Sequence, residues 1–342
     1  MDLKRKRQGE FDSYRRSAFL HPVAIDWPAM KFLVLCLAAC LLAGSASPAS
    51  AKLFTRITAE DGLLDYDLKA DQGNGWYTEM GTDYRFKVGF KQGERDSKGP
   101  VLVATLKPTG AEHCRGTHAL QLQIDARSET KSKGAAYKVA IASFKPKDPF
   151  SPSVLEARDW YHGFAMKIDA RSYKLPEAQG QEVIFEQFHQ GSPFHPPISL
   201  MIVNEHDAKA RGWTNTGKDG HFALMLIDDD HGPLNTLPGQ PRYFDLGPVI
   251  TGKWIAWVVR VRPSPSKAEG AVTVYMDGTP KLDLSNIKVG YDPHNPQYAA
   301  HKPPPYFDYA DVLIYRAHGD NFQRIFFDEV RFADALEDAS IP

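Results

Sequence analysis

A glutamine and a histidine two residues apart are the side chains of this sequence best suited to proton chemistry. Gln187 and His189 lie in the segment 183–190, where apolar residues predict a β-strand. Side chains two apart in a strand project from the same face. An amide can hydrogen-bond a carboxylate, and an imidazole, with an unperturbed pKa of about 6.5, can move a proton near neutral pH. The competing interpretation is a solvated strand that carries two polar residues without function.

A second candidate segment, residues 309–316, lies near the C-terminus. If Val312 and Ile314 face a core, the odd-numbered residues from 309 to 315 project from the opposite face. Tyr315 could then act as a phenolic acid or base, and Tyr309 and Asp311 would lie beside it. The alternative for Tyr315 is a tyrosine that packs at a sheet edge.

Charged residues offer further candidates. Arg115, Arg127 and Lys138 could each hold an anionic group of a substrate, although most exposed basic side chains are merely solvated. The run 228–230, three aspartates followed by His231, could supply oxygen ligands for Ca²⁺, but a polar turn is the interpretation that we favour. No paired cysteine, His-x-His or His-Glu-x-x-His spacing is present, which argues against a transition-metal site.

Strands must position these residues, because alternation with period two recurs along the chain and helical periodicity is hard to find. Clusters of Gly, Pro, Asp and Asn separate the segments, and no repeat of fixed period appears. This pattern predicts one all-β domain, a two-sheet sandwich or jelly roll. The predicted strands are 84–91, 100–107, 118–125, 136–143, 160–168, 182–189, 198–204, 221–227, 254–261, 272–276, 309–316 and 324–332, with a hairpin turn at Asp277-Gly278.

Several motifs, in this order, resemble the polysaccharide lyases built on a concanavalin A-like jelly roll, the group of heparin lyase I, glucuronan lyase and alginate lyases. The resemblance covers most of residues 110–333. It rests on Trp160-Tyr161-His162-Gly163-Phe164, Gln187-Phe188-His189 followed by Pro196-Pro197, Gly252-Lys253-Trp254 leading to Asp277-Gly278, residues 309–315, and Phe327-Asp328-Glu329-Val330.

The resemblance implies a lyase that cleaves a 4-linked uronic acid polysaccharide by β-elimination, with Gln187, His189 and Tyr315 lining the site. We expect them to converge on one concave face, with His189 as base, Tyr315 as acid and Gln187 neutralising the substrate carboxylate. Arg127, Lys138, Arg115 and Tyr309 are the expected substrate-binding residues. The family's Arg-x-Glu strand could be Arg127-Ser128-Glu129 or be degenerate at 138–140.

Two departures from the family pattern concern the last strand, where Asp311 and Leu313 replace a lysine and a glycine. A negative Asp311 would repel a substrate carboxylate, so a jelly-roll protein that binds sugar without cleaving it is an alternative. A glycoside hydrolase ranks third, since the run of closely spaced carboxylates used by hydrolases of this fold is missing. The lyase reaction requires no cofactor. A structural calcium ion, bound by residues 228–230, is the one metal that we consider.

The N-terminus predicts export. An apolar run over 32–43 is followed by small residues that end in Ala49-Ser50-Ala51, the pattern of a secretory signal peptide spanning residues 30–51. Residues 1–29 are a long leader or follow from an upstream start codon; we favour translation from Met30. Lipidation at Cys40 is the less favoured alternative. The mature domain, residues 52–342, would be periplasmic or secreted, with Cys114 as its one cysteine.

The charge of the mature chain limits its partners. Residues 52–342 contain 34 Lys and Arg against 38 Asp and Glu, which excludes a broad basic face for nucleic acid. We expect no stable membrane insertion after signal cleavage, a monomer, and an acidic polysaccharide of the glucuronan, alginate or glycosaminoglycan type as partner. The charge balance argues weakly against heavily sulfated chains.

Overall fold

The structure is a computed structural model, and residues 51–342 form one compact unit. It describes residues 52–57, 66–67, 75–80, 85–91, 104–110, 112–124, 136–143, 151–173, 182–214, 219–234, 239–317 and 323–342. The predicted leader and signal peptide, residues 1–51, lie outside these ranges. In the described part of the chain, no helix is long and apolar enough to cross a membrane.

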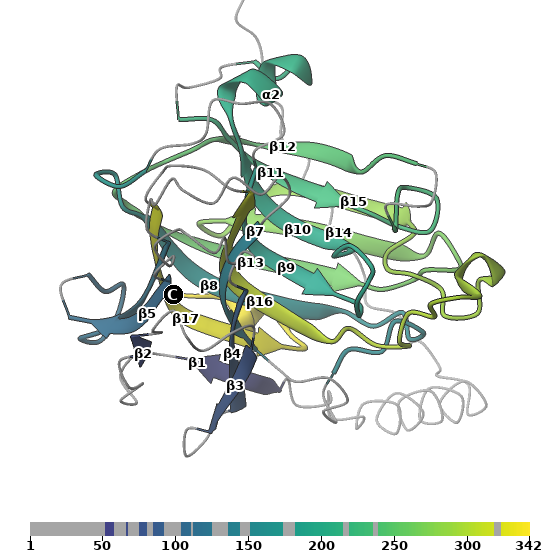
Figure 1. Cartoon of the computed structure of the whole chain (residues 1–342), viewed down its shortest axis with the longest axis horizontal. Helices are drawn as coiled ribbons and strands as arrows, with labels where there is room; N and C mark the ends of the chain where they lie inside the picture. Colours follow the sequence, from purple (N-terminus) through teal and green to yellow (C-terminus); the bar gives the residue numbers. More distant parts are fainter. Residues whose placement is uncertain are drawn as a thin grey trace, which may run out of the picture. The chain divides into compact units, whose positions relative to one another are not determined.

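Two antiparallel sheets make up the fold (Figure 1). In the described residues, the first sheet has nine strands in the order β15-β14-β13-β8-β17-β6-β5-β2, with β1 paired to β17. Its strands are β1 (Leu53–Ile57), β2 (Tyr66–Asp67), β5 (Ala104–Thr109), β6 (Ala119–Ile124), β8 (Trp160–Ile168), β13 (Trp254–Arg262), β14 (Gly270–Met276), β15 (Thr279–Ile287) and β17 (Gln323–Ala333).

The second sheet has eight strands within the described ranges, in the order β12-β11-β10-β9-β16-β7-β4-β3. They are β3 (Gly75–Met80), β4 (Arg85–Lys91), β7 (Ala136–Ala142), β9 (Val183–His189), β10 (Ile198–Val203), β11 (His221–Leu226), β12 (Arg242–Pro248) and β16 (Tyr309–Ala317). The helical elements in the described residues are short: α2 (Glu205–Ala210), η2 (Pro296–Tyr298) and α3 (Leu336–Ala339).

Alternating apolar residues pack the two sheets face to face. Phe185 and Phe222 of the second sheet contact Trp257 of the first, with ring centroids 5.5 and 5.1 Å apart, and all three side chains are fully buried. Burial of such large apolar side chains is the main stabilising contribution of a sandwich core. The predicted all-β class is therefore confirmed. The predicted strands did not include β1, β2, β3 or β12, and the helix α2 was not predicted.

The outer face of the second sheet, turned away from this core, is called the site face below. It carries its own apolar cluster over β10 and β11, because Met201 and Met225 point outward between core residues. Phe194, Tyr291 and Tyr298 come from loops and pack on this cluster. The loops thus cover the β10–β11 part of the site face, whereas the predicted chemistry lies on the neighbouring strands β9 and β16.

Candidate active site

Pairing between β9 and β16 brings the two predicted segments side by side. Gln187 lies opposite Asp311, and His189 lies opposite Tyr309. The Gln187 amide donates a long hydrogen bond of 3.4 Å to the Asp311 carboxylate. The rings of His189 and Tyr309 are stacked, with centroids 4.9 Å apart and planes 11° apart. Four polar side chains from two strands therefore meet on the site face.

Solvent reaches this group at the His189 end. The side chains of His189 and Asp308 are 14% and 20% exposed, whereas Gln187 and Asp311 are buried. Asp308 donates its backbone N–H to the His189 carbonyl at 2.7 Å, and its carboxylate lies 3.9 Å from His189 Nδ1. A carboxylate at Nδ1 favours a proton there, which leaves Nε2 as the basic nitrogen. The sequence reasoning missed Asp308.

The loop that follows His189 is held by a buried amide. Gln190 Nε2 donates to the carbonyls of Tyr291 and Pro304, and Gln190 Oε1 accepts from the Tyr291 N–H, at 2.7, 2.9 and 2.7 Å. Gly191 follows with φ of +80°, and a Cβ there would lie 2.7 Å from Pro304 Cδ. Glycine is therefore required where these loops meet, and Gln190 fixes the chain beside His189.

Tyr315 shares the site face but lies further along β16. Its cross-strand partner is Ile184, after a bulge in the pairing, so its Cα is about 13 Å from that of Asp311 at a rise of about 3.3 Å per residue. The Tyr315 phenol is nevertheless near enough to contribute to raising the pKa of Tyr309. Burial raises the pKa of both phenols, and that of Tyr309 goes well above 10. Both are thus neutral proton donors at pH 7.

The three basic residues predicted to bind substrate lie in different places. Lys138 of β7 lies opposite Tyr315 in the ladder. Arg127 lies outside the described residues. Arg115 is not brought to the site face, because its backbone N–H binds Asp328 of the first sheet and its side chain donates to the Pro342 carbonyl. The expectation that Arg115 lies with Gln187 and His189 is therefore wrong.

A buried polar chain lies on the core side of β9, directly behind Gln187. His162 of β8 joins Glu186 Oε1 at 3.2 Å through Nδ1 and Ser143 Oγ at 2.9 Å through Nε2. Burial lowers the pKa of His162 to about 3. Burial also raises the pKa of Glu186 well above its usual range, and Asp311 adds to that rise. The pair is therefore neutral, a carboxylic acid next to an uncharged imidazole.

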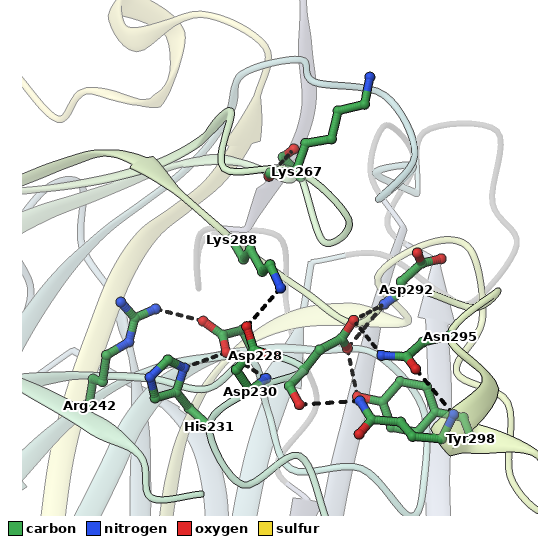
Figure 2. A network of polar contacts seen from close by, with 12 residues as sticks. Asp228, Asp230, His231, Arg242, Lys267, Lys288, Asp292, Asn295 and Tyr298 are labelled. Carbon is green, nitrogen blue, oxygen red and sulfur yellow. Dashed lines mark hydrogen bonds and ion pairs between the residues drawn. The ribbon is translucent and has the colours of Figure 1, made fainter.

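The aspartate run 228–230 forms a polar network rather than an open group of ligands (Figure 2). Asp228 pairs with His231 and Arg242, at 2.5 and 2.7 Å. Asp229 accepts from Tyr298 at 2.6 Å and from Asn295 at 3.2 Å. In the part of the chain that the structure describes, no group of three or more His, Cys, Asp or Glu residues is placed to hold a metal ion. The network fastens the loop that carries Tyr291 and Tyr298.

Comparison with known proteins assigns this two-sheet jelly roll, with its Gln-x-His strand beside a tyrosine strand, to a family of carbohydrate-active proteins. The family described as polysaccharide lyase matches residues 111–331. No curated protein matches the chain significantly. The family match over residues 111–331 spans more than half of the sequence, and the chain therefore belongs to the polysaccharide lyase family.

Solved structures are also similar to this chain. An endo-β-1,4-glucuronan lyase from the fungus Trichoderma reesei is similar over 73% of this chain and 97% of its own, with 13% identity and a TM-score of 0.50. An alginate lyase from Klebsiella pneumoniae is similar over 74% and 96%, with 10% identity and a TM-score of 0.43. The predicted jelly roll is confirmed, and family membership makes the protein a polysaccharide lyase.

Proposed function

We propose that this lyase cleaves a 4-linked uronic acid polysaccharide by β-elimination on the site face. The observation that carries the proposal is the placement of Gln187, His189 and Tyr309 together on one sheet face of a polysaccharide lyase fold, with Tyr315 further along the same face. Such a substrate has an acidic proton at C5, next to a carboxylate, and a leaving oxygen on C4. The reaction therefore needs a base, an acid and a donor to the carboxylate.

His189 is the base in this proposal. Its imidazole lies at the exposed end of the group, and the Asp308 carboxylate near Nδ1 supports Nε2 as the nitrogen that takes the C5 proton. Stacking on Tyr309 restricts the ring to one orientation. The electron pair of the C5–H bond then forms the C4=C5 double bond, and the C4–O bond breaks.

Tyr315 is the proposed acid, and Tyr309 is a positioning residue for His189. Burial raises the pKa of both phenols, and Asp311 and Asp308 add to the rise at Tyr309. Both phenols therefore carry a proton at neutral pH. In this proposal Tyr315 delivers its proton to O4, while Gln187 donates to the substrate carboxylate and so favours loss of the C5 proton.

This chemistry supports a polyuronate as the substrate class. The similar endo-β-1,4-glucuronan lyase is named for such a polymer. A panel of glucuronan, alginate and glycosaminoglycans, assayed by ultraviolet absorbance of the unsaturated product, tests the proposal. We expect absorbance to rise with at least one 4-linked polyuronate and to stay flat with neutral glucans. Failure on every uronic acid polysaccharide would contradict the assigned reaction.

Export completes the proposal. The signal-like sequence of residues 30–51 supports a mature protein that begins near Lys52 and meets its substrate in the periplasm or outside the cell. Mass spectrometry of protein from the native host should give a mass that begins near Lys52. An intact Met1 or Met30 terminus, or a lipid on Cys40, would show that this part of the proposal is wrong.

A further inference from the structure

An arginine outside the predicted site lies over the site face, beyond Tyr315. Arg211 follows α2, and its guanidinium lies 4.0 Å from the ring centroid of Tyr243 on β12. Its Nη2 donates to Glu182 Oε1 at 3.1 Å. The side chains of Arg211 and Glu182 are 26% and 19% exposed, so both remain partly accessible to solvent. Arg211, Glu182 and Tyr243 are called the edge cluster below.

The edge cluster is next to the proposed proton donor. Glu182 immediately precedes Val183, which faces the core, so by strand parity Glu182 belongs to the site face with Ile184. Ile184 is the cross-strand partner of Tyr315. Glu182 is therefore the diagonal neighbour of Tyr315, at a Cα distance of about 7–8 Å. A polysaccharide with one sugar at Tyr315 would place a nearby sugar at the edge cluster.

Aromatic side chains next to the cluster restrict Arg211. Trp213 lies 6.0 Å from the Arg211 guanidinium and stacks on His221, with ring centroids 5.8 Å apart. His221 Nδ1 is bound to Asp245 Oδ1 at 2.7 Å. Because an arginine held on aromatic rings has fewer conformations to lose, it binds a planar carboxylate at lower entropic cost.

The chemistry of the edge cluster matches a uronate sugar better than a plain anion. A guanidinium donates two parallel hydrogen bonds to a carboxylate, and the Glu182 carboxylate accepts from sugar hydroxyls. A sulfate or phosphate ion would meet the negative Glu182 without offering it a donor. We infer that Arg211 and Glu182 form a binding subsite for a uronate unit adjacent to the unit that is cleaved. This inference rests on the proposed function.

Equilibrium binding of β-1,4-linked glucuronate oligosaccharides of increasing length tests the subsite. The mature chain with His189→Ala prevents cleavage during the titration, and Arg211→Ala is added to it. Long oligosaccharides should bind about ten- to a hundredfold more weakly after Arg211→Ala, the range expected for lost hydrogen bonds to a charged group. Oligosaccharides too short to reach past Tyr315 should bind as before. Arg211→Lys keeps the charge but loses the planar fork, and should recover only part of the affinity.

Arg158→Ala is the matched control. Arg158 also lies on an aromatic ring, that of Trp160 at 4.8 Å, and is paired with Asp334, but these residues are at the first sheet. It should change binding at no length. Thermal unfolding of each variant reports damage to the fold.

The way in which the affinity loss after Arg211→Ala varies with oligosaccharide length decides whether the subsite exists. Unchanged affinity in a folded Arg211→Ala protein, or an equal loss at every length, would overturn the subsite. If the wild type cleaves no polyuronate but the length-dependent loss persists, the proposed reaction fails and the subsite stands. If the wild type neither binds nor cleaves oligosaccharides of any polyuronate in the panel, both are refuted.

Discussion

Replacing Tyr315 with Phe is the sharpest perturbation of the proposed mechanism, because it removes one hydroxyl and keeps the ring. Loss of a general acid lowers kcat by about 10²- to 10⁴-fold, or roughly 3–5 kcal/mol in activation free energy. Tyr315 is half-buried with its pKa raised by burial, so the substitution removes a neutral donor and no charge. We therefore expect the loss in kcat with little change in KM.

Tyr309→Phe is the control that the chain itself offers. The stacked ring against His189, with centroids 4.9 Å apart, is kept, and only the hydroxyl of the more strongly shifted phenol is lost. Activity should fall less than about tenfold. Tyr309→Ala also removes the stacking, which is worth about 0.5–1.5 kcal/mol for an aromatic pair, and should cost up to about another tenfold.

Initial rates of unsaturated product formation, measured by ultraviolet absorbance on the polyuronate that the wild type cleaves best, separate the two roles. Thermal unfolding midpoints within a few degrees of the wild type show that the variants are folded. An inactive Tyr309→Phe beside an active Tyr315→Phe would reverse the two assignments. Full activity in both variants would refute a phenolic acid altogether.

Three further predictions concern charge. Since burial raises the pKa of Tyr315, the fall in wild-type kcat caused by its ionisation should occur above pH 10 and should be missing from the pH profile of Tyr315→Phe. A fall below pH 10 that is missing from the variant would contradict the burial argument. Because its pKa is raised, Glu186 contributes fully to stability below about pH 4.5, and that contribution declines as pH rises. Glu186→Gln should therefore raise the unfolding midpoint, relative to the wild type, more at pH 8 than at pH 4. An equal shift at both pH values would count against this prediction. Asp311→Asn removes a negative charge beside Gln187 and should lower KM for a polyuronate by about tenfold, equivalent to about 1.4 kcal/mol; a higher KM would show that Asp311 binds substrate instead.

Local alternation was sufficient to predict the strands and the faces of β16. Val312 and Ile314 are buried in the core, and Asp311 and Tyr315 project from the other face, as their spacing predicts. Tyr309, at the start of the strand, stacks on His189 and also packs against the core cluster. Strand parity is a local property of the backbone, because successive side chains point to opposite faces wherever the ladder is regular. The same argument placed Gln187 and His189 together.

Irregular pairing breaks the regular alternation of side chains within β9. Strict alternation back from His189 would put Phe185 on the site face, yet Phe185 and Glu186 both point toward the core, because the pairing with β10 and β16 shifts at this point. A bulge adds one residue to a strand and reverses the parity beyond it. The buried pair of Glu186 and His162 followed from this shift and had no sequence signal.

The sequence by itself determined the all-β class, the lyase resemblance and the pairing of Gln187 with His189 on one face. Only the tertiary structure decided that Tyr309 rather than Tyr315 stacks on His189, that Arg115 belongs to the other sheet, and that Arg211 reaches Glu182. Register between strands more than a hundred residues apart is set by how the whole core packs. Spacing along the chain specifies which face a side chain takes, but it carries no information about which distant residue lies opposite.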